Sequence, residues 1–143
     1  MFKTQEERIL LSGGFDPLHV GHLRMIQEAA KLGRVIIALN SDEWLQRKKG
    51  YSFMSWEDRA EILMGLQSVW KVISFDDSDE TACDAIRKEE PTVFGNGGDR
   101  IANNTPEVRL CKEMGVRLVW NLGGGKIRSS SDLVESSSIK SDS

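Results

Sequence analysis

The sequence is poor in the residues that build metal sites and disulfides. Its 143 residues include only two histidines, two cysteines and three prolines. Cys83 and Cys111 each fall in a helix-like segment and lack the spacing of metal ligands, so we expect reduced, structural thiols in a cytoplasmic protein. Because both histidines lie in one turn and no further Cys/His cluster exists, the sequence does not favour a zinc site.

Long apolar runs are also missing. The longest unbroken run, residues 35–39, is too short to span a bilayer, and residues 1–8 are polar, unlike the apolar region of a signal peptide. A net charge of -3 argues against a general nucleic-acid binder, which would be basic. We expect one domain over residues 1–135, and a polar, disordered tail over residues 136–143.

Short apolar segments alternate with amphipathic ones along the chain. We expect strands at residues 9–11, 35–39, 71–75, 92–94 and 116–120. We expect helices at residues 21–32, 43–46, 55–66, 81–89 and 106–114, and in the third of them Ile62, Leu63 and Leu66 form the buried stripe. This alternation predicts an α/β fold, a Rossmann-like, doubly wound, five-stranded parallel sheet with helices on both faces.

Residues 13–22, with the sequence Gly-Gly-Phe-Asp-Pro-Leu-His-Val-Gly-His, form the most informative stretch. They follow the first strand, and their glycines allow backbone N–H groups to approach a ligand closely. A helix that begins near Leu18 would place His19 and His22 on one face of its first turn. Phosphate binds well there because free N–H groups and the helix dipole point the same way. Incidental surface histidines are the alternative interpretation.

Three polar or basic positions follow the second strand. Asp42 would either cap the next short helix or touch substrate. Lys49 closes a basic triplet that is a solvated loop by default, yet it would overhang the phosphate turn. Arg59, in the first turns of the third helix, would either reach an anion or pair with Asp58 or Glu61.

Two further glycine-rich segments follow the last two strands. Residues 95–100 can bend around a base or ribose while Asp99 and Arg100 offer opposite charges, although a plain glycine-rich turn would look similar. Residues 123–131 combine glycines, two cations and three serines, which would cap a final helix and donate to phosphate. The fold would gather these segments at one edge of the sheet, where open parallel sheets bind ligands.

Several of these motifs resemble those of the cytidylyltransferase-like nucleotidyltransferases. Residues 14–22 resemble the family's HxGH signature, and residues 128–131 resemble its second phosphate motif. Residues 97–100 are similar to a turn of the glycerol-3-phosphate cytidylyltransferase and heptose-phosphate adenylyltransferase branch, although Asn96 stands where that turn has lysine. The resemblance covers residues 9–134 and implies transfer of a nucleoside monophosphate to a phosphorylated small molecule with release of pyrophosphate. CMP from CTP is the first choice, and adenylyl transfer to a sugar 1-phosphate such as a heptose phosphate is the alternative.

The resemblance also implies a role for each matching residue. The catalytic residues would be His19, His22, Lys49 and Arg128. The nucleotide would contact Gly13, Gly14, Phe15, Asp16, Gly21, Gly97, Asp99, Arg100, Ser129, Ser130 and Ser131, and the acceptor would contact Arg59 and Asp42. Mg²⁺ would be held mainly through the triphosphate and not by protein side chains. A homodimer is implied, although Trp70 stands where many members have the aspartate of a dimer-contact motif.

Two other function classes share some of these features. Both phosphate motifs also echo the signatures of class I aminoacyl-tRNA synthetases, but the acidic composition argues against an RNA-linked enzyme. A non-catalytic nucleotide sensor could keep the same pocket. Because every expected catalytic position holds a chemically competent residue, the enzyme is the favoured hypothesis.

Overall fold

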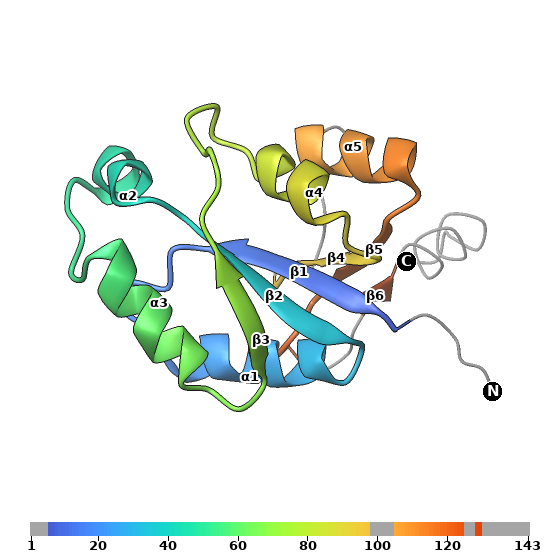
Figure 1. The fold of residues 1–143 in the computed structure, drawn as a ribbon, viewed down its shortest axis with the longest axis horizontal. Coiled ribbons are helices and arrows are strands. Elements are labelled where there is room, and N and C mark those ends of the chain that lie inside the picture. Colours follow the sequence, from blue (N-terminus) through green and yellow to red (C-terminus); the bar gives the residue numbers. More distant parts are fainter. Residues whose placement is uncertain (1–5, 98–104, 125–127, 130–143) are drawn as a thin grey trace.

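The computed structural model describes residues 6–97, 105–124 and 128–129 (Figure 1). The strands are β1 (Arg8–Gly13), β2 (Arg34–Leu39), β3 (Val69–Ile73), β4 (Val93–Gly95), β5 (Arg117–Trp120) and β6 (Arg128–Ser129). The helices are α1 (Val20–Ala30), α2 (Asp42–Lys49), α3 (Trp56–Met64), α4 (Cys83–Glu89) and α5 (Pro106–Met114). Within the described residues, no helix is both long and apolar enough to cross a membrane.

The strands form one sheet in the order β3-β2-β1-β4-β5-β6. The pairs among β1 to β5 are parallel, and β1 lies beside β2 from Arg8 opposite Arg34 to Gly13 opposite Leu39. This arrangement confirms the expected α/β fold with five parallel strands. The antiparallel strand β6 was not expected, because a two-residue strand beside β5 has no apolar run that could signal it.

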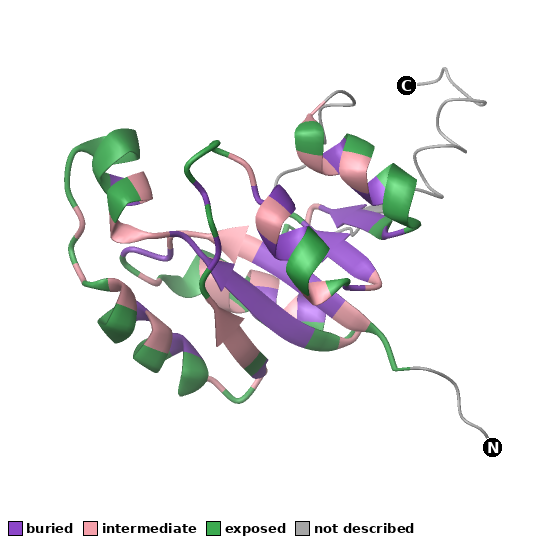
Figure 2. Ribbon diagram, turned by 45° about the horizontal axis from the view of Figure 1, so that its top comes forward, coloured by how far each residue is buried: buried purple, intermediate pink, exposed green. Residues whose placement is uncertain are grey.

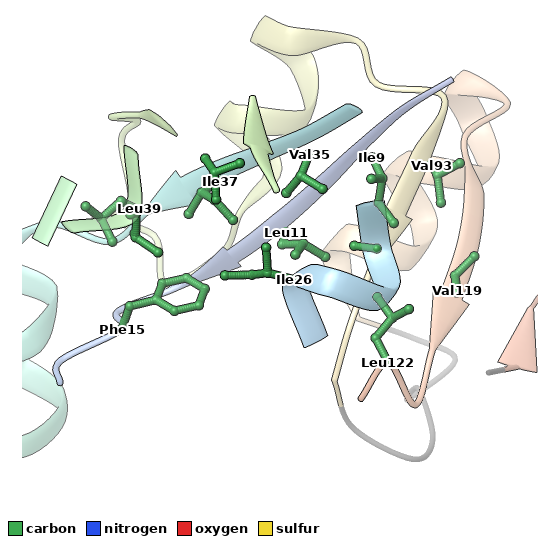
Figure 3. Packing of buried hydrophobic residues seen from close by; sticks show 13 residues of the cluster. Ile9, Leu11, Phe15, Ile26, Val35, Ile37, Leu39, Val93, Val119 and Leu122 are labelled. Atoms are coloured by element: carbon green, nitrogen blue, oxygen red, sulfur yellow. The ribbon is translucent and has the colours of Figure 1, made fainter. Parts of the chain in front are cut away.

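Helices cover both faces of the sheet, α1 and α3 on one and α4 and α5 on the other (Figure 1). Side chains alternate between the two faces along a strand, so Ile9 and Leu11 of β1 pack with Ile26 of α1, whereas Leu10 packs with Ile86 of α4. The first of these clusters continues to the carboxyl end of β1 (Figure 3). The central strands are buried on both sides, as parallel sheets usually are (Figure 2).

Two elements differ from the sequence-based expectation in ways that matter for the site. The third strand begins at Val69, two residues earlier than expected, because Val69 is buried and pairs with Val35. Helix α2 includes the basic triplet that was expected in a loop. It begins after Ser41, whose hydroxyl accepts from the Trp44 N–H at 3.0 Å, so Ser41 is the N-cap and Asp42 is not.

The C-terminal end of α2 explains why the triplet is helical. Arg47, Lys48 and Lys49 occupy its last turn, where positive charge meets the negative end of the helix dipole. Gly50 then adopts a φ of +83°, and its N–H donates to the Gln46 carbonyl at 2.8 Å. The helix therefore delivers Lys49 to the carboxyl edge of the sheet.

The buried stripe of α3 also needs a correction. Leu63 is 1% exposed, as expected, but Ile62 is 43% exposed. Adjacent helical residues point about 100° apart, so the two cannot face the same core. The inward position next to Leu63 in the stripe is taken by Arg59, one turn earlier.

This correction yields a stability prediction. Leu63→Ala should lower the free energy of unfolding by about 2–5 kcal/mol, because it empties a filled core position. Ile62→Ala is the matched control on the same helix and should cost about 1 kcal/mol or less. Urea denaturation of both variants measures the difference, and equal losses would contradict the observed orientation of α3.

Candidate active site

The phosphate turn joins the end of β1 to the start of α1. His19 is extended, with φ -140° and ψ 178°, so it is the N-cap of α1 and the helix begins at Val20, between the expected starts near Leu18 and at residue 21. His22 is therefore the third residue of the helix. The two imidazole rings stack with centroids 3.8 Å apart and an interplanar angle of 26°. The spacing of three residues thus brings the two rings together, as the sequence suggested.

The two histidines cap the helix reciprocally. The Gly21 N–H donates to Nδ1 of His19 at 3.1 Å, and the His19 N–H donates to Nδ1 of His22 at 3.2 Å. A ring nitrogen that accepts a hydrogen bond carries no proton, so each neutral ring holds its proton on Nε2. Both rings therefore keep an Nε2–H donor for a ligand.

Glycine at position 21 is required by this stacked arrangement. A Cβ at this position would lie 2.9 Å from Cε1 of His19, closer than real Cβ contacts. A larger residue would push the His19 ring away from its capping position. The glycine of the motif therefore serves the geometry of the histidines directly.

The environment of His22 keeps its ring neutral. Burial is the main cause that lowers its pKa to about 4, and the charge of His19 adds to the effect. Phe15, buried just after β1 (Figure 3), contributes to this environment. Its ring lies 4.7 Å from the His22 ring in an edge contact. At neutral pH, His22 is therefore a neutral hydrogen-bond donor and not a cation.

Asp16 ties the phosphate turn to the loop that follows α2. Its carboxylate is inaccessible to solvent and accepts from the N–H groups of Phe53 at 2.7 Å and Met54 at 3.0 Å. Burial alone would raise the pKa of this carboxyl, but the hydrogen bonds and the Lys49 ammonium outweigh it and the pKa is lowered. The ionised side chain that we expected at the nucleotide is thus engaged within the protein.

Lys49 contacts the phosphate turn, which it was expected to overhang. Its ammonium donates to the Asp16 carbonyl at 2.6 Å and lies 3.4 Å from the Asp16 carboxylate. It also lies over the rings of Tyr51 and Phe53, 5.0 and 5.4 Å from their centroids. A flexible lysine in this position can exchange these contacts for a phosphate.

Arg59 makes contacts that the sequence did not suggest. Its guanidinium is fully buried and pairs with the Asp42 carboxylate at 2.6 Å. It donates to the carbonyls of Gly14 and Asn40 at 2.9 Å and of Met54 at 3.1 Å. The expected pairing with Asp58 or Glu61 is replaced by a set of carbonyls at the ends of β1 and β2.

Asp77, in the loop after β3, is the residue that sequence reasoning missed. It is 5% exposed, and its carboxylate accepts from the Asn40 side chain at 3.0 Å and from the Ser41 N–H and hydroxyl at 2.8 Å each. Asp77 lies in an acidic run that looks like a solvated loop. The available signal was its place after a strand adjacent to β2, where polar groups of both strands meet.

Some expected site residues lie at or beyond the limits of the described chain. Gly97 follows β4 at the carboxyl edge of the sheet. The backbone of Arg128 and Ser129 forms β6 beside β5. Asp99, Arg100, Ser130 and Ser131 lie outside the described residues, and with them the tail at residues 136–143.

The buried contacts of Arg59, which we call the Arg59 clamp, are its ion pair with Asp42 and its hydrogen bonds to three carbonyls. They lead to a prediction for stability. Arg59→Met should lower the free energy of unfolding by about 3–5 kcal/mol, because it leaves buried carbonyls without donors and removes the ion pair with Asp42. Arg87→Met, on the exposed surface of α4, is the control and should stay within about 0.5 kcal/mol of the wild type. A loss for Arg59→Met no larger than that control in urea denaturation would refute the clamp.

The neutral ring of His22 generates a prediction for pH dependence. Its folded-state pKa lies below the ordinary 6.5, so the unfolded state binds more protons between about pH 4 and 6.5. The stability linked to His22 is thus fully present above pH 6.5 and is lost as the pH falls through that window. The free energy of unfolding should therefore depend less on pH in His22→Gln than in the wild type.

A proton NMR titration measures the pKa directly. The His22 ring should titrate near pH 4, and His19→Gln should raise this pKa only partly towards 6.5, because burial is the larger cause. Titration of His22 at its ordinary pKa in the wild type would contradict the neutral donor.

Comparison with known proteins places this geometry in a family. The sequence model of a family described as cytidylyltransferase-like matches residues 10–135. The chain is similar to the bifunctional protein HldE of Wolinella succinogenes, with 39% identity over 138 residues that cover 94% of this chain and 28% of that protein. It is also similar to the HldE protein of Haemophilus ducreyi, with 38% identity over 126 residues that cover 85% of this chain and 24% of that protein.

A solved structure supports the fold. A lipopolysaccharide core biosynthesis protein from Thermoplasma volcanium matches with a TM-score of 0.64 and 21% identity, over 77% of this chain and 87% of that one. The chain spans about a quarter of the length of the curated relatives it matches. The match over residues 10–135 confirms the expected family, and the chain belongs to the cytidylyltransferase-like family.

Proposed function

We propose that this chain transfers AMP from ATP to a sugar 1-phosphate, such as a heptose phosphate, and releases pyrophosphate. The sequence alone favoured CTP as the donor. The comparisons support the alternative better, because the similar curated proteins are HldE proteins. The turn that residues 97–100 resemble occurs in both kinds of enzyme and does not separate the two donors. Both hypotheses, CTP or ATP as the donor, involve transfer of a nucleoside monophosphate.

The observation that carries this proposal is the reciprocal cap at the start of α1. It leaves two stacked imidazoles with Nε2–H donors at the positive end of a helix. Hydrogen-bond donors in such a position stabilise negative charge that develops on phosphate oxygens. His19 and His22 would thus hold the α-phosphate and the oxygen that bridges it to the β-phosphate.

The reaction needs only positioning and neutralisation of charge. An oxygen of the acceptor phosphate attacks the α-phosphorus, a new phosphoanhydride bond forms, and the bond to the bridging oxygen breaks as pyrophosphate leaves. Lys49 would leave the Asp16 carbonyl to align the α-phosphate with the acceptor phosphate. Asp16 and Arg59 would position the turn and the loop, since their polar atoms are engaged within the protein.

The remaining expected contacts complete the proposal. Arg128 with Ser129, Ser130 and Ser131 would bind the β- and γ-phosphates, and Gly97, Asp99 and Arg100 would face the nucleoside. Gly13 and Gly14 would let the backbone approach the phosphates. Among the described residues, no group of His, Cys, Asp or Glu side chains is arranged to hold a metal ion. Mg²⁺ would be held mainly through the triphosphate.

We also propose a homodimer and a cytoplasmic location. A homodimer could use the exposed ring of Trp70, 41% exposed on the outer strand β3 and covered on one side by the Arg34 guanidinium. A cytoplasmic location fits the two free cysteines, both buried, of which Cys111 has its pKa raised to about 12, first by burial. Sedimentation of the wild type and of Trp70→Ala tests the dimer.

Pyrophosphate release tests the function. ATP, CTP, UTP and GTP are each combined with heptose 1-phosphate and with glycerol 3-phosphate. We expect release with ATP and the sugar phosphate. Release of pyrophosphate with CTP and glycerol 3-phosphate instead would favour the cytidylyltransferase hypothesis. Binding of a triphosphate without pyrophosphate release in the presence of either acceptor would support a non-catalytic nucleotide sensor.

Variants of the histidines test the mechanism. His22→Ala should lower kcat by on the order of 10²-fold or more, because it removes one donor to the transition state. His22→Gln places an amide N–H near the position of Nε2 and should retain more activity than His22→Ala. Equal turnover in all three proteins, with circular dichroism confirming folding, would remove His22 from the catalytic set.

A further inference from the structure

Two aromatic rings beside Lys49 are exposed although they are apolar. Phe53 is 64% exposed and Tyr51 is 46% exposed, and Phe53 is the most exposed large hydrophobic residue in the described part of the chain. Their rings meet edge to face, with centroids 5.2 Å apart and an interplanar angle of 79°. This geometry leaves open ring surface above the loop that follows α2.

Hydrogen bonds to the phosphate turn fix the position of the loop that carries these rings. The Phe53 N–H donates to the buried carboxylate of Asp16, and the neighbouring Met54 N–H donates to its other oxygen. The Met54 carbonyl accepts from Arg59, which also holds Gly14 at the end of β1. The backbone that carries Phe53 is therefore anchored to the segment that carries His19, three residues after Asp16.

A cation completes this surface. The Lys49 ammonium lies 5.0 Å from the Tyr51 ring centroid and 5.4 Å from that of Phe53. Cations at this distance are attracted by the ring faces and stay accessible to an anion. A ligand that carries both a phosphate and an apolar face would meet the ammonium and the rings at once.

The sheet order indicates which substrate reaches these rings. The chain reverses its direction of winding between β1 and β4, and open parallel sheets bind nucleotides at such a switch point. Gly97 follows β4 on one side of α1, where the nucleoside is proposed. Tyr51 and Phe53 follow α2 and lie on the side of β2, away from the proposed nucleoside site. They are therefore placed to contact the acceptor.

We propose that Tyr51 and Phe53 form a stacking platform that selects a cyclic sugar phosphate as the acceptor. The C–H face of the sugar ring lies on the aromatic rings, and its phosphate binds the Lys49 ammonium. The proposal rests on the proposed function and adds the two residues that favour a ring-shaped acceptor over a linear phosphorylated alcohol. Burial of apolar sugar surface against aromatic side chains supplies the preference.

The test compares binding in the full chain and does not depend on turnover. Calorimetry gives the Kd of heptose 1-phosphate, glycerol 3-phosphate, inorganic phosphate and ATP for the wild type and for Tyr51→Ala/Phe53→Ala. The control is Met114→Ala, which removes an exposed apolar side chain at the end of α5. Saturation-transfer NMR records whether aromatic protons of the wild type contact the sugar C–H groups.

We expect the double variant to bind heptose 1-phosphate at least 10-fold more weakly, while its affinities for inorganic phosphate and ATP change less than twofold. Met114→Ala should match the wild type throughout. An equal loss for inorganic phosphate would mean that the rings only position Lys49, and an equal loss for ATP would assign them to the nucleotide. Either result overturns the platform, as does unchanged or absent binding of the sugar phosphate.

The platform and the proposed function fail in different ways. If the wild type binds the sugar phosphate through the rings but releases no pyrophosphate from any triphosphate, the platform stands and the transferase reaction fails. If pyrophosphate is released with ATP but the ring variants bind the sugar phosphate normally, the reaction stands and the platform fails.

Discussion

The buried guanidinium of Arg59 is the interaction on which the site depends. It joins the carbonyls that end β1 and β2 to the loop after α2, at Gly14, Asn40 and Met54. The Gly14 and Asn40 carbonyls lie just after β1 and β2, where regular pairing stops, and a buried carbonyl without a donor would be costly. Asp16 adds a second link between the phosphate turn and this loop, because its carboxylate accepts from the Phe53 and Met54 N–H groups. Together they hold the phosphate turn and the loop that follows Lys49 in one unit.

On this framework, the proposed chemistry would come from the two imidazoles and the Lys49 ammonium. The helix cap orients both imidazoles and places their protons on Nε2, and burial keeps His22 uncharged. Lys49 rests on the Asp16 carbonyl and the neighbouring rings, so it can move to a phosphate without unfolding the loop. Rigid donors and a movable cation suit a reaction in which charge is redistributed among phosphates.

Local features could be predicted from the sequence, but contacts between distant residues could not. The i, i+3 spacing of His19 and His22 predicted that the two residues share one face of the helix, and their rings do lie together. The partners of Arg59 are mostly backbone carbonyls, which every residue carries and no side-chain pattern reveals. Asp77 was hidden for a related reason, because its acidic neighbours suggested a solvated loop.

The central claim is that the start of α1 binds the triphosphate, and amide NMR with a non-hydrolysable ATP analogue tests it most directly. The account predicts the largest shifts at the amides of residues 19–22, with smaller ones at Lys49. The molecule offers another hollow of about 720 Å³ at the opposite edge of the sheet, lined by Lys31, Arg34 and Trp70 among others. Shifts confined to that hollow, with residues 19–22 unchanged, would contradict the account.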